Sequence, residues 1–90
     1  MALFTCMLEF DGGTYISQFR AKSANRAVAM YATEVLDNGA ISKLPIRRKL
    51  SEAIALEKPV AIDGVRNVWC CSTIVGKRLA LLNIVATDSQ

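Results

Sequence analysis

The sequence predicts an α+β fold in which a four-stranded antiparallel sheet carries two helices packed on one face. Two observations support this prediction: two β-prone runs near the ends of the chain each fold back at a glycine-containing turn, and two amphipathic stretches lie between them. The predicted order of elements is therefore ββααββ. No internal repeat, linker or low-complexity segment interrupts the chain, so residues 1–90 are expected to form a single compact domain.

The first hairpin is expected to turn at Gly12-Gly13. This turn sets Phe10 opposite Tyr15 and gives the hairpin one nearly apolar face. That face contains Phe4, Cys6, Leu8, Phe10, Tyr15, Ser17, Phe19 and Ala21. A three-residue loop from Asp11 to Gly13 would mix polar and apolar residues on both faces, so we favour the shorter turn.

The last hairpin, from Val65 to Thr87, is expected to turn at Gly76-Lys77, with the positive φ of a type II′ turn at the glycine. Val75 then lies opposite Arg78, and both faces of the hairpin are mostly apolar. One face contains Val68, Cys70, Ser72, Ile74, Leu79, Leu81, Asn83 and Val85. The other contains Trp69, Cys71, Thr73, Val75, Arg78, Ala80, Leu82, Ile84 and Ala86.

Two helices can cover only one of these faces, so the second requires another copy of the chain, a partner or a ligand. We expect self-association, as a homodimer. The interface candidates are Trp69, Cys71, Thr73, Leu82 and Ile84. If the opposite face is the uncovered one, the candidates are instead Cys70, Leu81 and Asn83.

The first helix is expected to begin after an N-cap at Ser23 and to run to about Asp37, where Asn38-Gly39 ends it. The second helix is expected from about Ile46 or Arg47 to Glu57, and Pro59 stops it. A short extended piece from Val60 to Ile62 is possible before the Asp63-Gly64 turn.

Composition gives limited information about function. The chain is 52% hydrophobic, which argues against disorder, and its formal net charge of +3 is mild for a nucleic-acid binder. The apolar N-terminus lacks a basic leader and is expected to be a strand, not a signal peptide. Three cysteines without metal-ligand spacing fit a reducing cytoplasm, and we expect no membrane association.

The sequence contains no catalytic signature. It has no histidine, which excludes Ser-His and Cys-His nucleophiles and removes the commonest metal ligand. Cys70 and Cys71 are neighbours whose side chains point to opposite faces of a strand, so they are expected to be packing residues and not a redox pair. The carboxylates lack obvious partners. We therefore expect no catalytic residue, cofactor or metal, and we favour a non-enzymatic protein.

Basic residues cluster near the two predicted helix starts: Arg20, Lys22 and Arg26 at the first, and Lys43, Arg47, Arg48 and Lys49 at the second. If these ends were neighbours, the cluster would attract anions, nucleic acid included, and the helix N-termini would strengthen it. The alternative is a solvated surface, in which Arg48 pairs with Glu52 four residues on.

One stretch of the chain is similar to a known family. GGTYISQF followed by AKSANRAVAMYATEVL resembles the hairpin-then-helix opening of HicB-type antitoxins, where a Gly-Gly-Tyr turn leads to a strand and then to an Ala-rich helix. The resemblance covers about residues 7–36. The Pro-Gly-Cys strand expected before the helix is missing, and no site residue is carried over.

The sequence therefore predicts a small cytoplasmic protein, bacterial in origin, that self-associates and acts as a binding or interaction module. One alternative is a nucleic-acid-associated or regulatory, antitoxin-like protein that uses the basic helix ends. The other is a small-molecule-binding domain with a site near Trp69, for a ligand that the sequence does not identify.

Overall fold

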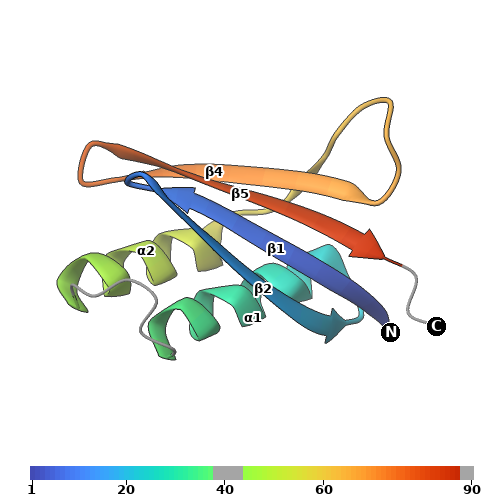
Figure 1. Cartoon of the computed structure of the whole chain (residues 1–90), viewed down its shortest axis with the longest axis horizontal. Helices are drawn as coiled ribbons and strands as arrows, with labels where there is room; N and C mark the ends of the chain where they lie inside the picture. The colour runs from blue at the N-terminus through green and yellow to red at the C-terminus, as the bar shows by residue number, and fades with distance from the viewer. Residues whose placement is uncertain (38–43, 88–90) are drawn as a thin grey trace.

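The computed structural model describes residues 1–37 and 44–87, and it contains two helices and a five-stranded antiparallel sheet (Figure 1). In chain order the elements are β1 (Ala2–Phe10), β2 (Gly13–Ala21), α1 (Ala24–Asp37), α2 (Leu44–Leu56), β3 (Val60–Ala61), β4 (Val68–Val75) and β5 (Arg78–Thr87). The predicted α+β class is confirmed. The prediction of four strands in the order ββααββ is wrong in detail, because the short piece at residues 60–61 pairs with β4 and adds a fifth strand.

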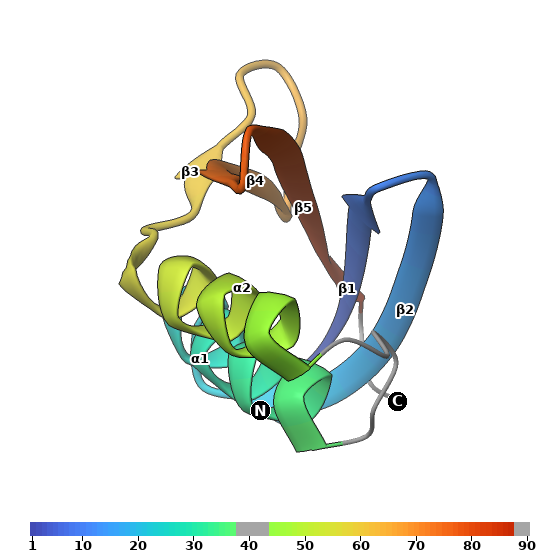
Figure 2. The ribbon, with the colours of Figure 1, turned by 90° about the vertical axis from the view of Figure 1, so that its left-hand side faces the viewer.

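The strands lie in the order β2-β1-β5-β4-β3, so the first and last hairpins join through β1 and β5 at the centre of the sheet. Both helices lie on the same side of this sheet, as Figure 2 shows. The central pairing places Cys6 beside Ile84 and Leu8 beside Leu82. It therefore decides which face of the last hairpin continues the apolar face of the first.

The last hairpin has the expected register, with Val75 opposite Arg78. Its turn differs from the prediction. Gly76 and Lys77 have φ of 57° and 68°, and positive φ at both central residues defines a type I′ turn instead of type II′. Type I′ geometry matches the right-handed twist of the flanking strands.

The first hairpin turns one residue earlier than predicted. Phe10 pairs with Gly13, and Asp11 and Gly12 form the turn with φ of 51° and 79°. Asp-Gly is a favoured type I′ pair, because both residues tolerate positive φ. The pairing therefore shifts by two residues, so that Leu8 and not Phe10 lies opposite Tyr15. A shift of two leaves every side chain on its predicted face.

The hydrophobic core lies between the sheet and the helices. Alternate residues of each strand point into it, as the period of a strand requires. The sheet contributes Phe4, Cys6, Leu8, Phe10, Ala21, Cys71, Val75, Ala80, Leu82 and Ile84. The helices contribute Ala24, Ala27, Val28, Tyr31, Ala32, Leu50 and Ile54, at the spacing expected of one helix face.

The predicted bounds of α1 are confirmed, and so is its N-cap, since the Ser23 hydroxyl accepts a hydrogen bond of 3.2 Å from the Arg26 N–H. Its predicted end at Asn38-Gly39 lies outside the described residues. The second helix begins at Leu44, earlier than predicted, so that Pro45 falls in its first turn. Proline is tolerated there because the first N–H groups of a helix have no partner within it.

Candidate functional site

The predicted interface residues lie on the face that the helices cover. Leu82 and Ile84 are 1% and 0% exposed, and Cys71 is buried, so these side chains belong to the core of the chain itself. Trp69 and Thr73 share that face and are half-buried. The assignment of this face as the uncovered one is therefore corrected. The two faces of the last hairpin are similarly apolar, and only the pairing of β1 with β5 distinguishes them.

The face of the sheet opposite the helices carries no element of the described chain, and we call it the outer face (Figure 2). Four of its large apolar side chains are more than half exposed: Ile16 at 60%, Val60 at 65%, Ile74 at 64% and Leu79 at 56%. By strand alternation and register the outer face consists of Leu3, Thr5, Met7, Glu9, Thr14, Ile16, Gln18, Arg20, Val60, Val68, Cys70, Ser72, Ile74, Leu79, Leu81, Asn83, Val85 and Thr87. The alternative candidates Cys70, Leu81 and Asn83 all lie here.

One row across the outer face is apolar except at a single position. The registers align Ile16 with Met7, Met7 with Asn83, and Asn83 with Cys70 on four successive strands. Asn83 is half-buried, and its side chain makes no hydrogen bond to any residue that the structure describes. A polar amide in an apolar row is stabilised when it gains a partner.

The charged residues of the outer face lie at opposite ends of the first hairpin. Glu9 pairs with Thr14 next to the turn, and Arg20 pairs with Leu3 at the far end. The six-residue separation along the strand corresponds to roughly 20 Å. Between them, Gln18 donates a hydrogen bond of 2.9 Å to the Thr5 hydroxyl.

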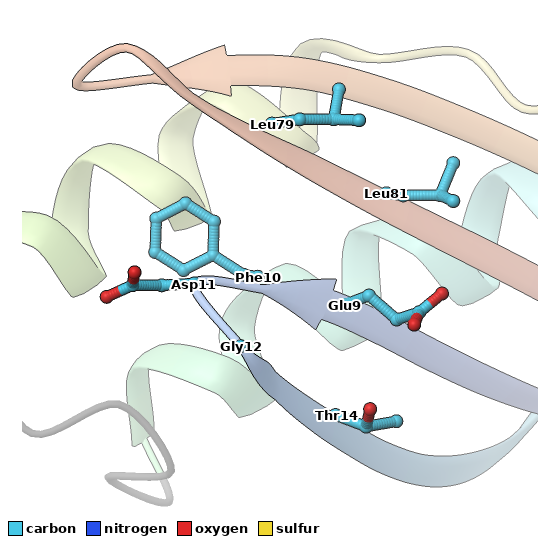
Figure 3. Close-up of a pocket in the computed structure, with 7 residues that line it drawn as sticks. All are labelled: Glu9, Phe10, Asp11, Gly12, Thr14, Leu79 and Leu81. Carbon is cyan, nitrogen blue, oxygen red and sulfur yellow. The ribbon is translucent and has the colours of Figure 1, made fainter.

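The end of the outer face near the turns is hollowed by a pocket of about 370 Å³ (Figure 3). Leu79 and Leu81 of β5 line one side of it. The first hairpin supplies Glu9, Phe10, Asp11, Gly12 and Thr14. The Asp11 carboxylate accepts a hydrogen bond of 2.5 Å from the Arg78 guanidinium, which ties the two turns together. The pocket therefore combines an apolar wall with the carboxylate of Glu9.

The two predicted groups of basic residues do not form one patch. Arg20, Lys22 and Arg26 line an open pocket of about 580 Å³ beside the start of α1. The helices run antiparallel (Figure 1), so the start of α2 lies at the other end of the helical layer. The 14 residues of α1 span roughly 20 Å, which sets the approximate separation of the two starts. Arg47, Arg48 and Lys49 lie at the start of α2. Lys43 is outside the described residues.

The antiparallel helices are joined by one buried hydroxyl. Ser51 donates a hydrogen bond of 2.6 Å to the Ala32 carbonyl oxygen. This contact fixes the offset of α2 along α1, and with it the separation of the basic groups.

Trp69 lies at the end of the sheet where α1 begins. Its ring packs against Phe4 with centroids 5.8 Å apart and an interplanar angle of 53°. It also lines a pocket of about 410 Å³ that includes Lys22, Ser23 and Asn25 from the start of α1. One of the alternatives that the sequence predicts is a small-molecule site near Trp69.

Two of the cysteines, Cys6 and Cys71, are buried as neutral thiols. Burial raises the pKa of the Cys6 thiol to about 12 and that of Cys71 to about 11, from 9.0. Thiols with such pKa values are neutral at physiological pH, and the thiolate is the reactive form. Within residues 1–37 and 44–87, no three His, Cys, Asp or Glu side chains are grouped so as to hold a metal ion. In the same residues no helix has the length and apolar character needed to cross a membrane.

No family model matches this chain, and we found no significant match to it among curated proteins or solved structures. The resemblance of residues 7–36 to HicB-type antitoxins therefore stays a prediction.

Proposed function

We propose that this protein is a self-associating interaction module in which two copies pack their outer faces together. The observation that supports the proposal is a sheet face, uncovered by the described chain, on which Ile16, Ile74 and Leu79 are more than half exposed. Two packed sheets bury side chains of this kind at a spacing of about 10 Å.

The size of the outer face suits a dimer. Four strands about 4.8 Å apart, each contributing about eight residues at about 3.4 Å per residue, cover roughly 500 Å² in plan. The accessible area of a corrugated face exceeds its plan area. The surface buried on each copy thus approaches the roughly 800 Å² of a stable protein interface.

The charges of the outer face favour a second copy over an unrelated partner. A two-fold axis that lies in the interface and crosses the strands exchanges the two ends of the sheet. The Arg20 end of one copy then faces the turn end of the other, where Glu9 lies, so opposite charges gather at each end of the interface.

The same axis pairs the central row with itself. Asn83 of one copy faces the partner's Asn83, and two asparagine side chains span the roughly 10 Å between packed sheets. Each amide N–H donates to the other carbonyl, so both polar groups are satisfied within an apolar interface. A single buried Asn pair of this kind fixes the register of an interface, as it does in coiled coils.

Sedimentation equilibrium tests the proposal with two matched variants. Leu79→Lys places a charge on the outer face, and Leu56→Lys places one on an exposed leucine of α2, where Leu56 is 82% exposed. We expect the wild type and Leu56→Lys to have about twice the monomer mass of 9.8 kDa, and Leu79→Lys to be monomeric with an unchanged circular dichroism spectrum. A monomeric wild type, or a dimeric Leu79→Lys, would overturn the proposal.

The amide pair has its own test. Asn83→Asp sets two carboxylates against each other across the axis, so dimerisation should weaken at neutral pH and recover as the carboxyls protonate near pH 4. Asn83→Leu should dimerise at both pH values. Equal dimerisation of Asn83→Asp at both pH values would show that Asn83 does not face itself.

A further inference from the structure

The geometry points to a binding site for a small amphipathic monocarboxylate in the pocket between Trp69 and the start of α1. This pocket contains no residue of the outer face, so the inference goes beyond the proposed self-association. It rests on three features of the pocket: an aromatic and small-residue floor, a cationic rim without a carboxylate, and walls held by backbone contacts.

The floor of the pocket is apolar and roomy. Phe4 and Trp69 form a tilted aromatic pair, and Trp69 stays half-buried although it lies on the helix-covered face. The remaining apolar lining is small: Ala2, Ala24, Pro59 and Ala86. Small residues around two rings leave a space of about 410 Å³, within the range of roughly 300–1,000 Å³ that small-molecule sites occupy.

The rim of the pocket favours an anion. Among the residues that the structure describes, Lys22 is the only charged one that lines the pocket, and its ammonium has no ion-pair partner there. Arg20 and Arg26 line the adjoining pocket, which shares Lys22 and Ser23 with this one. Among the described residues, none that lines either pocket is acidic. The charged side chains that line the two pockets are therefore all cationic.

Two residues of the first turn of α1 that line the pocket carry backbone donors. The Ser23 hydroxyl accepts the Arg26 N–H, and the Ser23 carbonyl accepts the Ala27 N–H. The N–H groups of Ala24 and Asn25, in the first turn of α1, have no partner within the helix. Both residues line the pocket. A carboxylate at this rim can thus accept from two N–H groups and pair with Lys22.

The opposite wall is held in place by the backbone. Asn67 adopts φ of 62°, a left-handed conformation that asparagine tolerates better than most residues, and its carbonyl accepts a hydrogen bond of 2.8 Å from the Ala86 N–H. This bond anchors the loop before β4 to the end of β5. A wall that is formed before the ligand arrives lowers the entropy cost of binding.

These features define the ligand class. The rings of Phe4 and Trp69 suit a flat apolar group, and a single ammonium with two N–H donors suits one carboxylate. A simple probe is 3-phenylpropionate, and its uncharged counterpart is 3-phenylpropionamide. The chain has one tryptophan, so Trp69 fluorescence reports on the pocket directly when excited where phenyl rings do not absorb.

The experiment titrates both probes into the full chain. We expect saturable quenching by 3-phenylpropionate, about tenfold weaker binding of the amide, and a similar loss for the carboxylate in Lys22→Gln. The control Lys77→Gln removes the same charge from the turn at the far end of the sheet and should bind as the wild type does. Ala86→Leu, which fills the pocket, should abolish binding without altering the circular dichroism spectrum.

Other outcomes would overturn the inference. These are no saturable quenching by the carboxylate up to about 10 mM, equal affinity for acid and amide, or unchanged affinity in Lys22→Gln. The test is separable from the proposed dimer, because Leu79→Lys should bind the probe normally. Loss of binding in Leu79→Lys would show that the site depends on association and would contradict a pocket complete within one chain.

Discussion

The hydroxyl of Tyr31 donates a hydrogen bond of 2.6 Å to the carbonyl oxygen of Tyr15. Tyr31 is 1% exposed, and its ring meets the edge of Phe19 at 86° with centroids 6.1 Å apart. Phe19 and Tyr15 both belong to the edge strand β2. This pair of contacts therefore fastens α1 to the side of the sheet that has no further strand beside it.

Removing the Tyr31 hydroxyl should measure the strength of that attachment. We expect Tyr31→Phe to lower the free energy of unfolding by about 1 kcal/mol, because the ring packing stays and one hydrogen bond is lost. Urea unfolding followed by Trp69 fluorescence gives the value. The control Tyr15→Phe removes a hydroxyl for which the structure records no hydrogen bond and should change little; equal losses in the two variants would contradict the assignment.

The first turn should be sensitive to a methyl group at one position. Gly12 has φ of 79°, and no atom lies within 4 Å of the position that a Cβ would occupy. We expect Gly12→Ala to cost about 1 kcal/mol through backbone strain alone. Asp11→Asn should stay within about 0.5 kcal/mol, because asparagine accepts positive φ and the exposed pair with Arg78 contributes little. Thermal unfolding compares the two, and equal stabilities would argue against the type I′ turn.

Alkaline pH should destabilise the fold. The pKa of Cys6 is raised to about 12 and that of Cys71 to about 11, and burial also raises the pKa of Tyr31. Unfolded thiols lose their protons near pH 9 while the folded ones remain neutral, so the unfolded state binds fewer protons. The contribution of these groups to the free energy of unfolding has its full value below about pH 8. It falls between about pH 9 and pH 12, by up to about 1.4 kcal/mol per pH unit for each group.

Urea midpoints measured from about pH 7 to pH 10.5 check this dependence. Cys71→Ala removes one of the two thiols, so its midpoint should fall less steeply than that of the wild type. A urea midpoint that does not change across this pH range would contradict the inference that burial raises the pKa of these thiols. So would a midpoint that falls with pH as steeply in Cys71→Ala as in the wild type.

The three cysteines should react at very different rates. Cys70 lies on the outer face and is half-buried, whereas Cys6 and Cys71 are buried. Mass spectrometry after brief maleimide treatment of the native protein should therefore find Cys70 modified and the other two protected until urea is added. If the outer faces pair, the Cys70 rate should also fall with rising protein concentration in the wild type but not in Leu79→Lys. Early labelling of Cys6 would contradict its burial in the hydrophobic core.

The local elements of this fold could be predicted from the sequence. The Ser23 side chain caps α1 through a hydrogen bond with Arg26, three residues on, so the start of this helix depends on a local contact. Gly76-Lys77 sets the register of the last hairpin. The register predicted for the first hairpin is wrong, because the turn is formed by Asp11 and Gly12 and not by Gly12-Gly13 or by a three-residue loop from Asp11 to Gly13. The faces were still predicted correctly, since strand parity survives a shift of two.

The location of the candidate sites depended on long-range contacts. Whether Leu82 or Leu81 faces the helices is decided by the pairing of β1 with β5, between residues more than seventy positions apart. The separation of Arg20 from Arg47 is decided by the antiparallel packing of two helices. Turns and caps are determined by neighbouring residues and can therefore be predicted from the sequence. The choice between two equally apolar faces depends on which distant surface is available to cover one of them, and only the assembled sheet and helices provide that surface.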